Sequence, residues 1–228
     1  MQSHMLAPKA TKSYVCMYVC CIYVCTYRKA ADGGQPEGAL ALGSWILEGR
    51  GGLKRDTAEA AKYIELASNK NVQEAHTMYG IMCNEGMGTP KDHQKAASLF
   101  SKAAAGGDLK ALYNFGVLQI EGRGVKPAQS KGMDAVLRAA TGGIPEAQFT
   151  VSIWYRDGAL GTKQDNKKAF EWAMKAAKQG HTQAQHNVGV QLAEGVGVAR
   201  NQRQAAEWYN KAVAAGQVQL LVAYVSVF

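Results

Sequence analysis

The sequence predicts an all-α protein, a solenoid of about five helix-turn-helix repeats of 36–37 residues with partial repeats at both ends. Alanine and glycine recur in four columns with one common period, each period contains two short amphipathic segments, and a glycine-rich stretch joins the two. The 228 residues include 25 glycines, which suits a helical protein only if its helices are short and its turns frequent.

The four columns share spacings of 36–37 residues. The pattern A-x-x-(aromatic or aliphatic)-x-x-x-A ends at Ala67, Ala103, Ala139, Ala176 and Ala212. It begins at Ala60, Ala96, Gly132, Ala169 and Ala205. The column in the loop holds Gly49, Gly86, Gly122, Gly158 and Gly195. The column inside the first segment holds Gly43, Gly80, Gly116, Ser152 and Gly189. Such units cannot bury their apolar face alone, so we expect them to stack.

The common period divides the chain into eight segments. We expect a non-native or disordered N-terminal segment at 1–26 and the tail of a partial repeat at 27–37. Complete repeats follow at 38–75, 76–111, 112–147, 148–184 and 185–217. The last segment, 218–228, is an apolar tail or a truncated repeat.

The second segment of each repeat has the signals of a capped amphipathic helix. In Asp165–Gly180, apolar residues recur at i, i+3, i+4 and i+7. Residues that can cap its start form the column Asp56, Asp92, Asp165 and Asn201. Residues that tolerate the left-handed conformation at its end form the column Gly107, Gly143, Gly180 and Gly216.

The first segment of each repeat, such as Ala111–Gly122, has a glycine in its middle. Glycine costs about 1 kcal/mol against alanine inside a helix. We therefore expect this column to mark where the paired helices approach closely.

The third and fourth repeats depart from the pattern. Ala128 stands at the cap position and Gly132 in an alanine column, so the second helix of the third repeat is expected to be the least stable. The fourth repeat has Ser152 in the glycine column and one extra loop residue.

The period and motifs resemble the Sel-1-like repeat family. Loops such as "EGMGTPKD" and "EGVGVARN" and second segments such as "AFEWAMKAAKQG" and "AAEWYNKAVAAG" carry the resemblance, which covers Ala30 to Gly216. Tetratricopeptide repeats, in contrast, have 34 residues and lack the glycine-rich connection. The resemblance implies a right-handed α-α superhelix and a non-catalytic adaptor or scaffold that holds partner proteins.

No motif in the repeats indicates an enzyme. "GRGG" and "GVGV" follow helical segments and belong to the loop column, so they are inter-helix turns and not phosphate loops. No H-E-x-x-H pattern occurs, and no serine has lysine three residues later. We expect no cofactor, no metal and no small-molecule substrate.

The formal charge of +8 comes from basic residues spread through every repeat. A nucleic-acid-binding protein usually gathers them on one face, so we expect a mixed surface and partners that are other proteins.

One acidic column is the candidate binding site: Glu48, Glu85, Glu121, Asp157 and Glu194. Acids at a helix C-terminus oppose the helix dipole, so a repeated acid needs an explanation. Either each pairs with a loop base such as Arg50 or Arg123, or the column is an acidic stripe on the concave face that selects basic partner segments. By analogy with tetratricopeptide arrays, Tyr113 and Phe149, which share another column of the first helix, could anchor a partner.

The N-terminal "YVCMYVCCIYVC" holds four of the five cysteines. Codons of a TATG tetranucleotide repeat encode Tyr14 to Cys20, which suggests translated microsatellite DNA from a retained intron or mis-assigned start in a eukaryotic gene. Lys9 and Lys12 before an apolar run leave a signal peptide open, although no A-x-A site follows. Cysteine metal binding or lipidation also stays open, whereas a membrane span of ~20 residues does not fit the run.

Three functions stay open at this point. The protein is an interaction scaffold, the regulatory repeat fragment of a longer enzyme or signalling protein, or a secretory-pathway quality-control component. The lone Cys83 in the repeats favours the cytoplasm, with the endoplasmic reticulum as the alternative.

Overall fold

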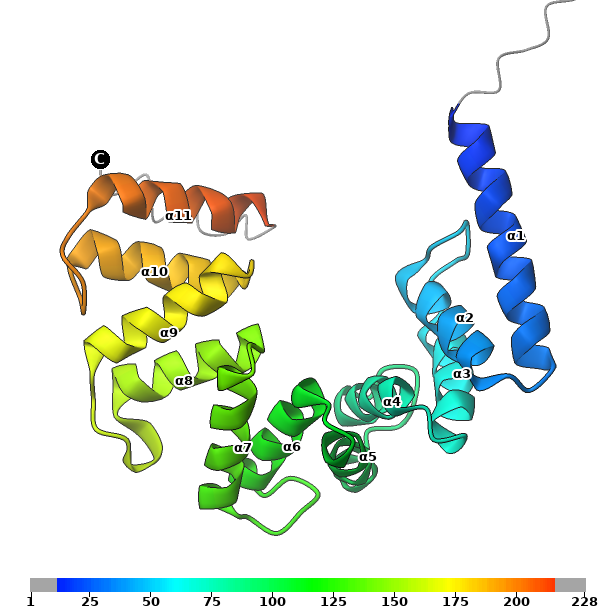
Figure 1. The fold of residues 1–228 in the computed structure, drawn as a ribbon, viewed down its shortest axis with the longest axis horizontal. Helices are drawn as coiled ribbons and strands as arrows, with labels where there is room; N and C mark the ends of the chain where they lie inside the picture. The colour runs from blue at the N-terminus through cyan, green and yellow to red at the C-terminus, as the bar shows by residue number, and fades with distance from the viewer. Residues whose placement is uncertain (1–11, 216–228) are drawn as a thin grey trace, which may run out of the picture. The chain divides into compact units, whose positions relative to one another are not determined.

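The computed structural model describes residues 12–215, with side chains from residue 22 onward, and this part of the chain is all α-helical (Figure 1). It contains eleven α-helices, one 3₁₀ turn and no strand within these limits. The expected apolar tail at 218–228 and the expected left-handed Gly216 lie outside the described residues.

Ten of these helices form five pairs of 13-residue helices, as the repeat predicts. The first helices are α2 (Pro36–Glu48), α4 (Gln73–Glu85), α6 (Leu109–Glu121), α8 (Pro145–Asp157) and α10 (Thr182–Glu194). The second helices are α3 (Thr57–Asn69), α5 (His93–Ala105), α7 (Gln129–Thr141), α9 (Asn166–Lys178) and α11 (Gln202–Ala214). Each first helix begins two or three residues before the expected start of its repeat. It starts two residues after the left-handed turn residue, which is Asn71 before α4 and a glycine before the other four.

The helices belong to two compact units, Met1–Asp108 and Leu109–Phe228. The first unit contains α1 to α5, and the second contains α6 to α11. Within each unit, the two helices of one repeat pack most extensively against each other, and the second helix also packs against the first helix of the next repeat.

Helix α1 spans Lys12–Asp32 and includes part of the segment 1–26. Residues 12–26, expected to be non-native or disordered, are helical and continuous with the following turns. The end of α1 packs on α2, where Tyr27 meets Trp45 edge-on at 5.3 Å between ring centroids. The turn after it places Gly34 at φ +77°, as at the ends of the complete repeats. The microsatellite origin of the segment stays a prediction.

The glycines inside the first helices mark close approach, as predicted. A methyl group added at Gly80 would lie 2.7 Å from the ring of Phe100, and one at Gly189 would lie 2.7 Å from the ring of Tyr209. Real Cβ atoms do not come this close to their neighbours, so a side chain there would separate the pair.

The third repeat brings its helices together with glycine on both sides. A Cβ at Gly132 would lie 2.6 Å from the carbonyl oxygen of Gly116, and a Cβ at Gly116 would lie 2.8 Å from that of Gly132. Gly132 therefore has a packing role that the sequence comparison did not predict.

The predicted caps of the second helices are present. The side chain of Asp56 accepts from the backbone N–H of Glu59 at 2.8 Å, and Asp92, Asp165 and Asn201 accept in the same way at 2.9–3.0 Å. Ala128 has a similar φ of −145°, but its ψ of 67° lies outside the extended range of the other caps, and it provides no side-chain acceptor.

We predict that Gly132→Ala lowers the stability of the protein, although it restores the alanine of the column. The clash with the Gly116 carbonyl should cost about 1–3 kcal/mol, more than the ~1 kcal/mol gained in helix propensity. The measurement is the free energy of unfolding in urea. Asp134→Ala on the exposed face of α7 is the control, and equal stabilisation by both would contradict the close approach.

We also predict that Ala128→Asp and Ala128→Asn each stabilise the protein by about 1 kcal/mol, because either side chain can accept from the free N–H groups of α7. The thermal midpoint of unfolding should rise for both. A rise for Asp alone would point to its charge near the helix dipole and not to the cap.

Candidate partner-binding surface

The acidic column lies at the last residue of each first helix, next to the left-handed loop glycine. Glu48 pairs with Arg50, and Glu121 pairs with Arg123, as the pairing interpretation predicts. Asp157 pairs instead with Arg156 of its own helix, at 2.7 and 2.9 Å, and this guanidinium lowers the pKa of the carboxyl group.

The other two acids have different surroundings. Glu85 accepts a hydrogen bond from the amide of Asn84 at 2.7 Å. Glu194 makes no ion pair with any described residue. The pairing interpretation therefore accounts for part of the column, and the exposed pairs are weak enough to exchange with a partner.

Each of these acids is the last residue on an accessible face of its first helix. We call this face the first-helix face. Its residues are Glu37, Ala41, Ser44 and Glu48 in α2; Glu74, Met78, Ile81 and Glu85 in α4; Lys110, Asn114, Val117 and Glu121 in α6; Glu146, Thr150, Ile153 and Asp157 in α8; and Gln183, Asn187, Val190 and Glu194 in α10. The spacing i, i+4, i+7, i+11 places them on one side, and none of the twenty is buried.

A second acidic position at the start of this face was not predicted. Glu37, Glu74 and Glu146 occupy it in three of the five repeats. Eleven residues separate each from the acid at the helix end, so helical spacing could have identified them. The face in these repeats has small or aliphatic side chains between two acids.

The faces of successive first helices adjoin within each unit. In the first unit, the hydroxyl of Ser44 lies 3.7 Å from the sulfur of Met78. In the second, Tyr113, which is next to Asn114 of the face in sequence, has its hydroxyl 3.1 Å from that of Thr150. A partner segment crossing the helices can therefore contact two repeats of one unit.

The two predicted aromatic anchors are half-buried and contact the following repeat. Tyr113 bonds to Thr150, and burial raises the pKa of its phenol. The ring of Phe149 lies 4.7 Å from that of His181. Much of each ring is already used in packing, so a role as anchor stays a prediction.

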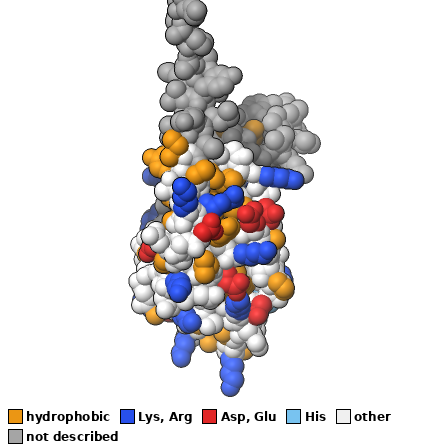
Figure 2. Space-filling view, turned by 90° about the vertical axis from the view of Figure 1, so that its right-hand side faces the viewer, with side chains coloured by type: hydrophobic (Ala, Val, Ile, Leu, Met, Phe, Trp, Pro, Cys, Tyr) orange, Lys and Arg blue, Asp and Glu red, His pale blue; other side chains and the backbone are white. Residues whose placement is uncertain are grey.

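Charges of both signs are mixed on the surface. On the face in Figure 2, acidic and basic side chains lie side by side, and no field of one sign dominates. Among the described residues, no cluster of three or more His, Cys, Asp and Glu could hold a metal ion. None of the described helices has the length and apolarity needed to cross a bilayer.

Comparison with known proteins identifies the repeats. The family profile described as Sel1 repeat matches residues 36–72, 73–108, 145–181 and 182–217, more than half of the chain. The solved structure of a Sel1 repeat protein from Oxalobacter formigenes is 27% identical with a TM-score of 0.77, over 94% of this chain and 65% of that one. The antigen c5321 of uropathogenic Escherichia coli, which has an SLR fold, is 29% identical with a TM-score of 0.66. The match covers 85% of this chain and 41% of that one.

Curated relatives match shorter stretches. Chitin synthase regulatory factor 3 of Schizosaccharomyces pombe is 39% identical over 72 residues, which are 31% of this chain and 8% of that protein. Chitin synthase regulator SKT5 of Saccharomyces cerevisiae is 37% identical over 67 residues, which are 29% of this chain and 10% of that protein. The chain thus spans a tenth or less of the length of these relatives.

His181, the residue beneath Phe149, should make stability depend on pH. Its Nδ1 accepts from the N–H of Ala184 at 3.2 Å, and burial lowers its pKa, opposed by the weaker effect of Glu146. The unfolded chain therefore binds the proton more readily than the folded one. The stability is present above the ordinary histidine pKa of about 6.5 and is lost as pH falls through the lowered pKa.

We predict that His181→Asn, which keeps a cap acceptor but does not titrate, makes unfolding less dependent on pH between about 7.5 and 5.5. The measurement is urea unfolding across this range. At pH 8 the two proteins should differ by less than about 1 kcal/mol. Parallel pH profiles would show that His181 does not contribute.

Proposed function

Because the chain belongs to the Sel1 repeat family, we propose that it is a non-catalytic adaptor that holds other proteins on its first-helix face. The observation that carries the proposal is the composition of that face. Accessible side chains follow one side of every first helix, and in α2, α4 and α8 acids stand at both ends. Sel1 repeats form a fold for protein interaction, and this surface is one that the paired helices leave open.

The chemistry of the face favours basic partner segments. Carboxylates near a binding surface raise the rate of encounter with cations and disfavour acidic partners. Arg50 and Arg123 do not prevent this, because side chains as exposed as theirs form ion pairs worth about 0–1 kcal/mol. Aliphatic residues such as Ile81 and Ile153 provide apolar contact between the acids.

A second candidate is the regulatory repeat region of a longer protein. The names of the curated relatives favour it, because both are regulators of an enzyme and the matched stretch is a tenth or less of each. The two candidates share the same surface and differ in whether the partner is a separate chain. A transcript that continues beyond this sequence would favour the second.

We predict that Glu121→Lys with Asp157→Lys weakens binding of a captured partner at least about tenfold, because both acids lie on the first-helix face of the second unit. The full chain serves as bait in affinity capture, and calorimetry measures the affinity of the recovered partner at two salt concentrations.

The matched control is Glu171→Lys, which reverses an exposed charge on α9 away from that face. It should leave the affinity unchanged. Unchanged affinity in the double variant would leave only the structural role of the acids, and recovery of no partner above background would count against the adaptor.

A further inference from the structure

The fourth repeat leaves unfilled a space that the other repeats fill with their own side chains. In the others, the glycine of the first helix faces a large apolar residue of the second, which is Ile64, Phe100, Val136 or Tyr209. In the fourth repeat these two positions hold Ser152 and Ala173. The serine adds one hydroxymethyl group, whereas alanine removes most of a larger side chain.

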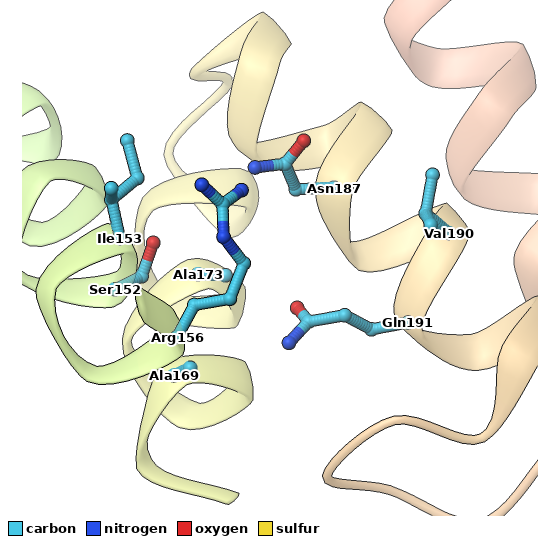
Figure 3. A pocket seen from close by; sticks show the side chains of 8 residues that line it. All are labelled: Ser152, Ile153, Arg156, Ala169, Ala173, Asn187, Val190 and Gln191. Atoms are coloured by element: carbon cyan, nitrogen blue, oxygen red, sulfur yellow. The ribbon is translucent and has the colours of Figure 1, made fainter. Parts of the chain in front are cut away.

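The result is a pocket of about 80 Å³ between α8, α9 and α10 (Figure 3). Ala169 and Ala173 of α9 form its floor, and Ile153 and Val190 stand on opposite sides. The pocket opens onto the first-helix face, of which Ile153 and Val190 are members.

Polar groups without an internal partner surround the opening. The amide of Gln191 points into the pocket, and the residue is only 7% exposed, yet its side chain makes no hydrogen bond to any described residue. The amide of Asn187 is likewise unpartnered among the described side chains, and it faces Arg156 across the opening in Figure 3. Both amides line the pocket and can hydrogen-bond to a group that enters it.

Gln191 also departs from its own column. The corresponding residues of the other first helices are Trp45, Met82, Leu118 and Trp154. Trp, Met and Leu side chains at that position offer apolar contact, whereas an amide can hydrogen-bond to an incoming peptide group as both donor and acceptor.

We propose that this pocket binds one branched aliphatic side chain of a partner protein, of the size of valine or isoleucine, while Asn187 and Gln191 bind the adjoining backbone. The proposal rests on the proposed function and names the segment that the surface recognises. The size follows from the volume of about 80 Å³, since the same place holds aliphatic Ile64 or Val136 in two other repeats and the larger rings of Phe100 and Tyr209 in the remaining two. An aromatic ring is too large, since an apolar cavity that holds benzene measures about 150 Å³.

Acidic side chains around the pocket favour basic residues on either side of the partner's aliphatic anchor. Asp157 and Glu194 lie at the ends of α8 and α10, and Glu146 lies at the start of α8. Arg156 is already paired with Asp157. The segment is therefore an aliphatic anchor between Lys or Arg residues, with an accessible backbone.

A reciprocal substitution tests the pocket. The variant Ser152→Gly with Ala173→Ile fills it from within and restores the arrangement of the other repeats. The probe is a display library of random 12-residue peptides selected on the full chain. We expect the selected peptides to share Val or Ile beside basic residues, and to bind the filled variant at least about tenfold more weakly.

The filled variant should also unfold at a higher temperature than the original protein, because it removes a cavity. Weaker binding by a more stable protein excludes misfolding as the cause. Replacing the aliphatic anchor of a selected peptide by Ala should weaken its binding to the original protein and have little further effect on the filled variant. Asn187→Ala, which leaves the pocket open, should also weaken the binding of the selected peptides.

Several outcomes would overturn the proposal. Selection of no peptide, selection of peptides without an aliphatic anchor, or equal binding to the filled variant would leave a packing defect only. If basic peptides lose affinity for Glu121→Lys with Asp157→Lys but bind the filled variant unchanged, the adaptor stands and the pocket does not.

Discussion

The close approach of two helices at a small residue is the contact on which every repeat depends. Where Gly80 faces Phe100 or Gly189 faces Tyr209, the missing Cβ lets an aromatic ring lie against the helix backbone. Dispersion and apolar burial at such a contact offset the low helix propensity of glycine. The helices of each pair are equal in length, and four of the five second helices begin at a side-chain cap, so the contact falls at the same position along each helix.

The sequence was sufficient for this architecture because its determinants are local and repeated. A cap such as Asp165 and a left-handed glycine such as Gly195 act within a few residues, and five copies made them visible. The composition of residues 12–26 is unlike that of the repeats, whereas the backbone there is helical. Amino-acid composition alone does not indicate that these residues continue the helix that contains Tyr27.

The loop of the fourth repeat shows why non-local packing could not be predicted. Leu160 adopts φ +56° in the loop column where Gly88 and Gly197 have φ +68° and +74°. A Cβ at either glycine would lie about 2 Å from backbone atoms of the preceding repeat. Leu160 instead packs its side chain with the apolar residues of α7. The sequence shows the extra loop residue, but the surface on which Leu160 packs belongs to α7, in the preceding repeat.

In the candidate site, too, the features set by nearby residues could be predicted from the sequence, and those set by packing between helices could not. The acids were found from one column, and the partners of Glu48 and Glu121 came from the adjacent loop. The pocket required knowing that Ser152 and Ala173 face each other, since each departure alone looks like an ordinary substitution. The space of about 80 Å³ is open on the first-helix face, so it leaves apolar side chains of the repeat without the packing contacts that the other repeats make there. The second helix of this repeat keeps its Asp165 cap, and the position that the other repeats fill from within is the one that we propose a partner fills here.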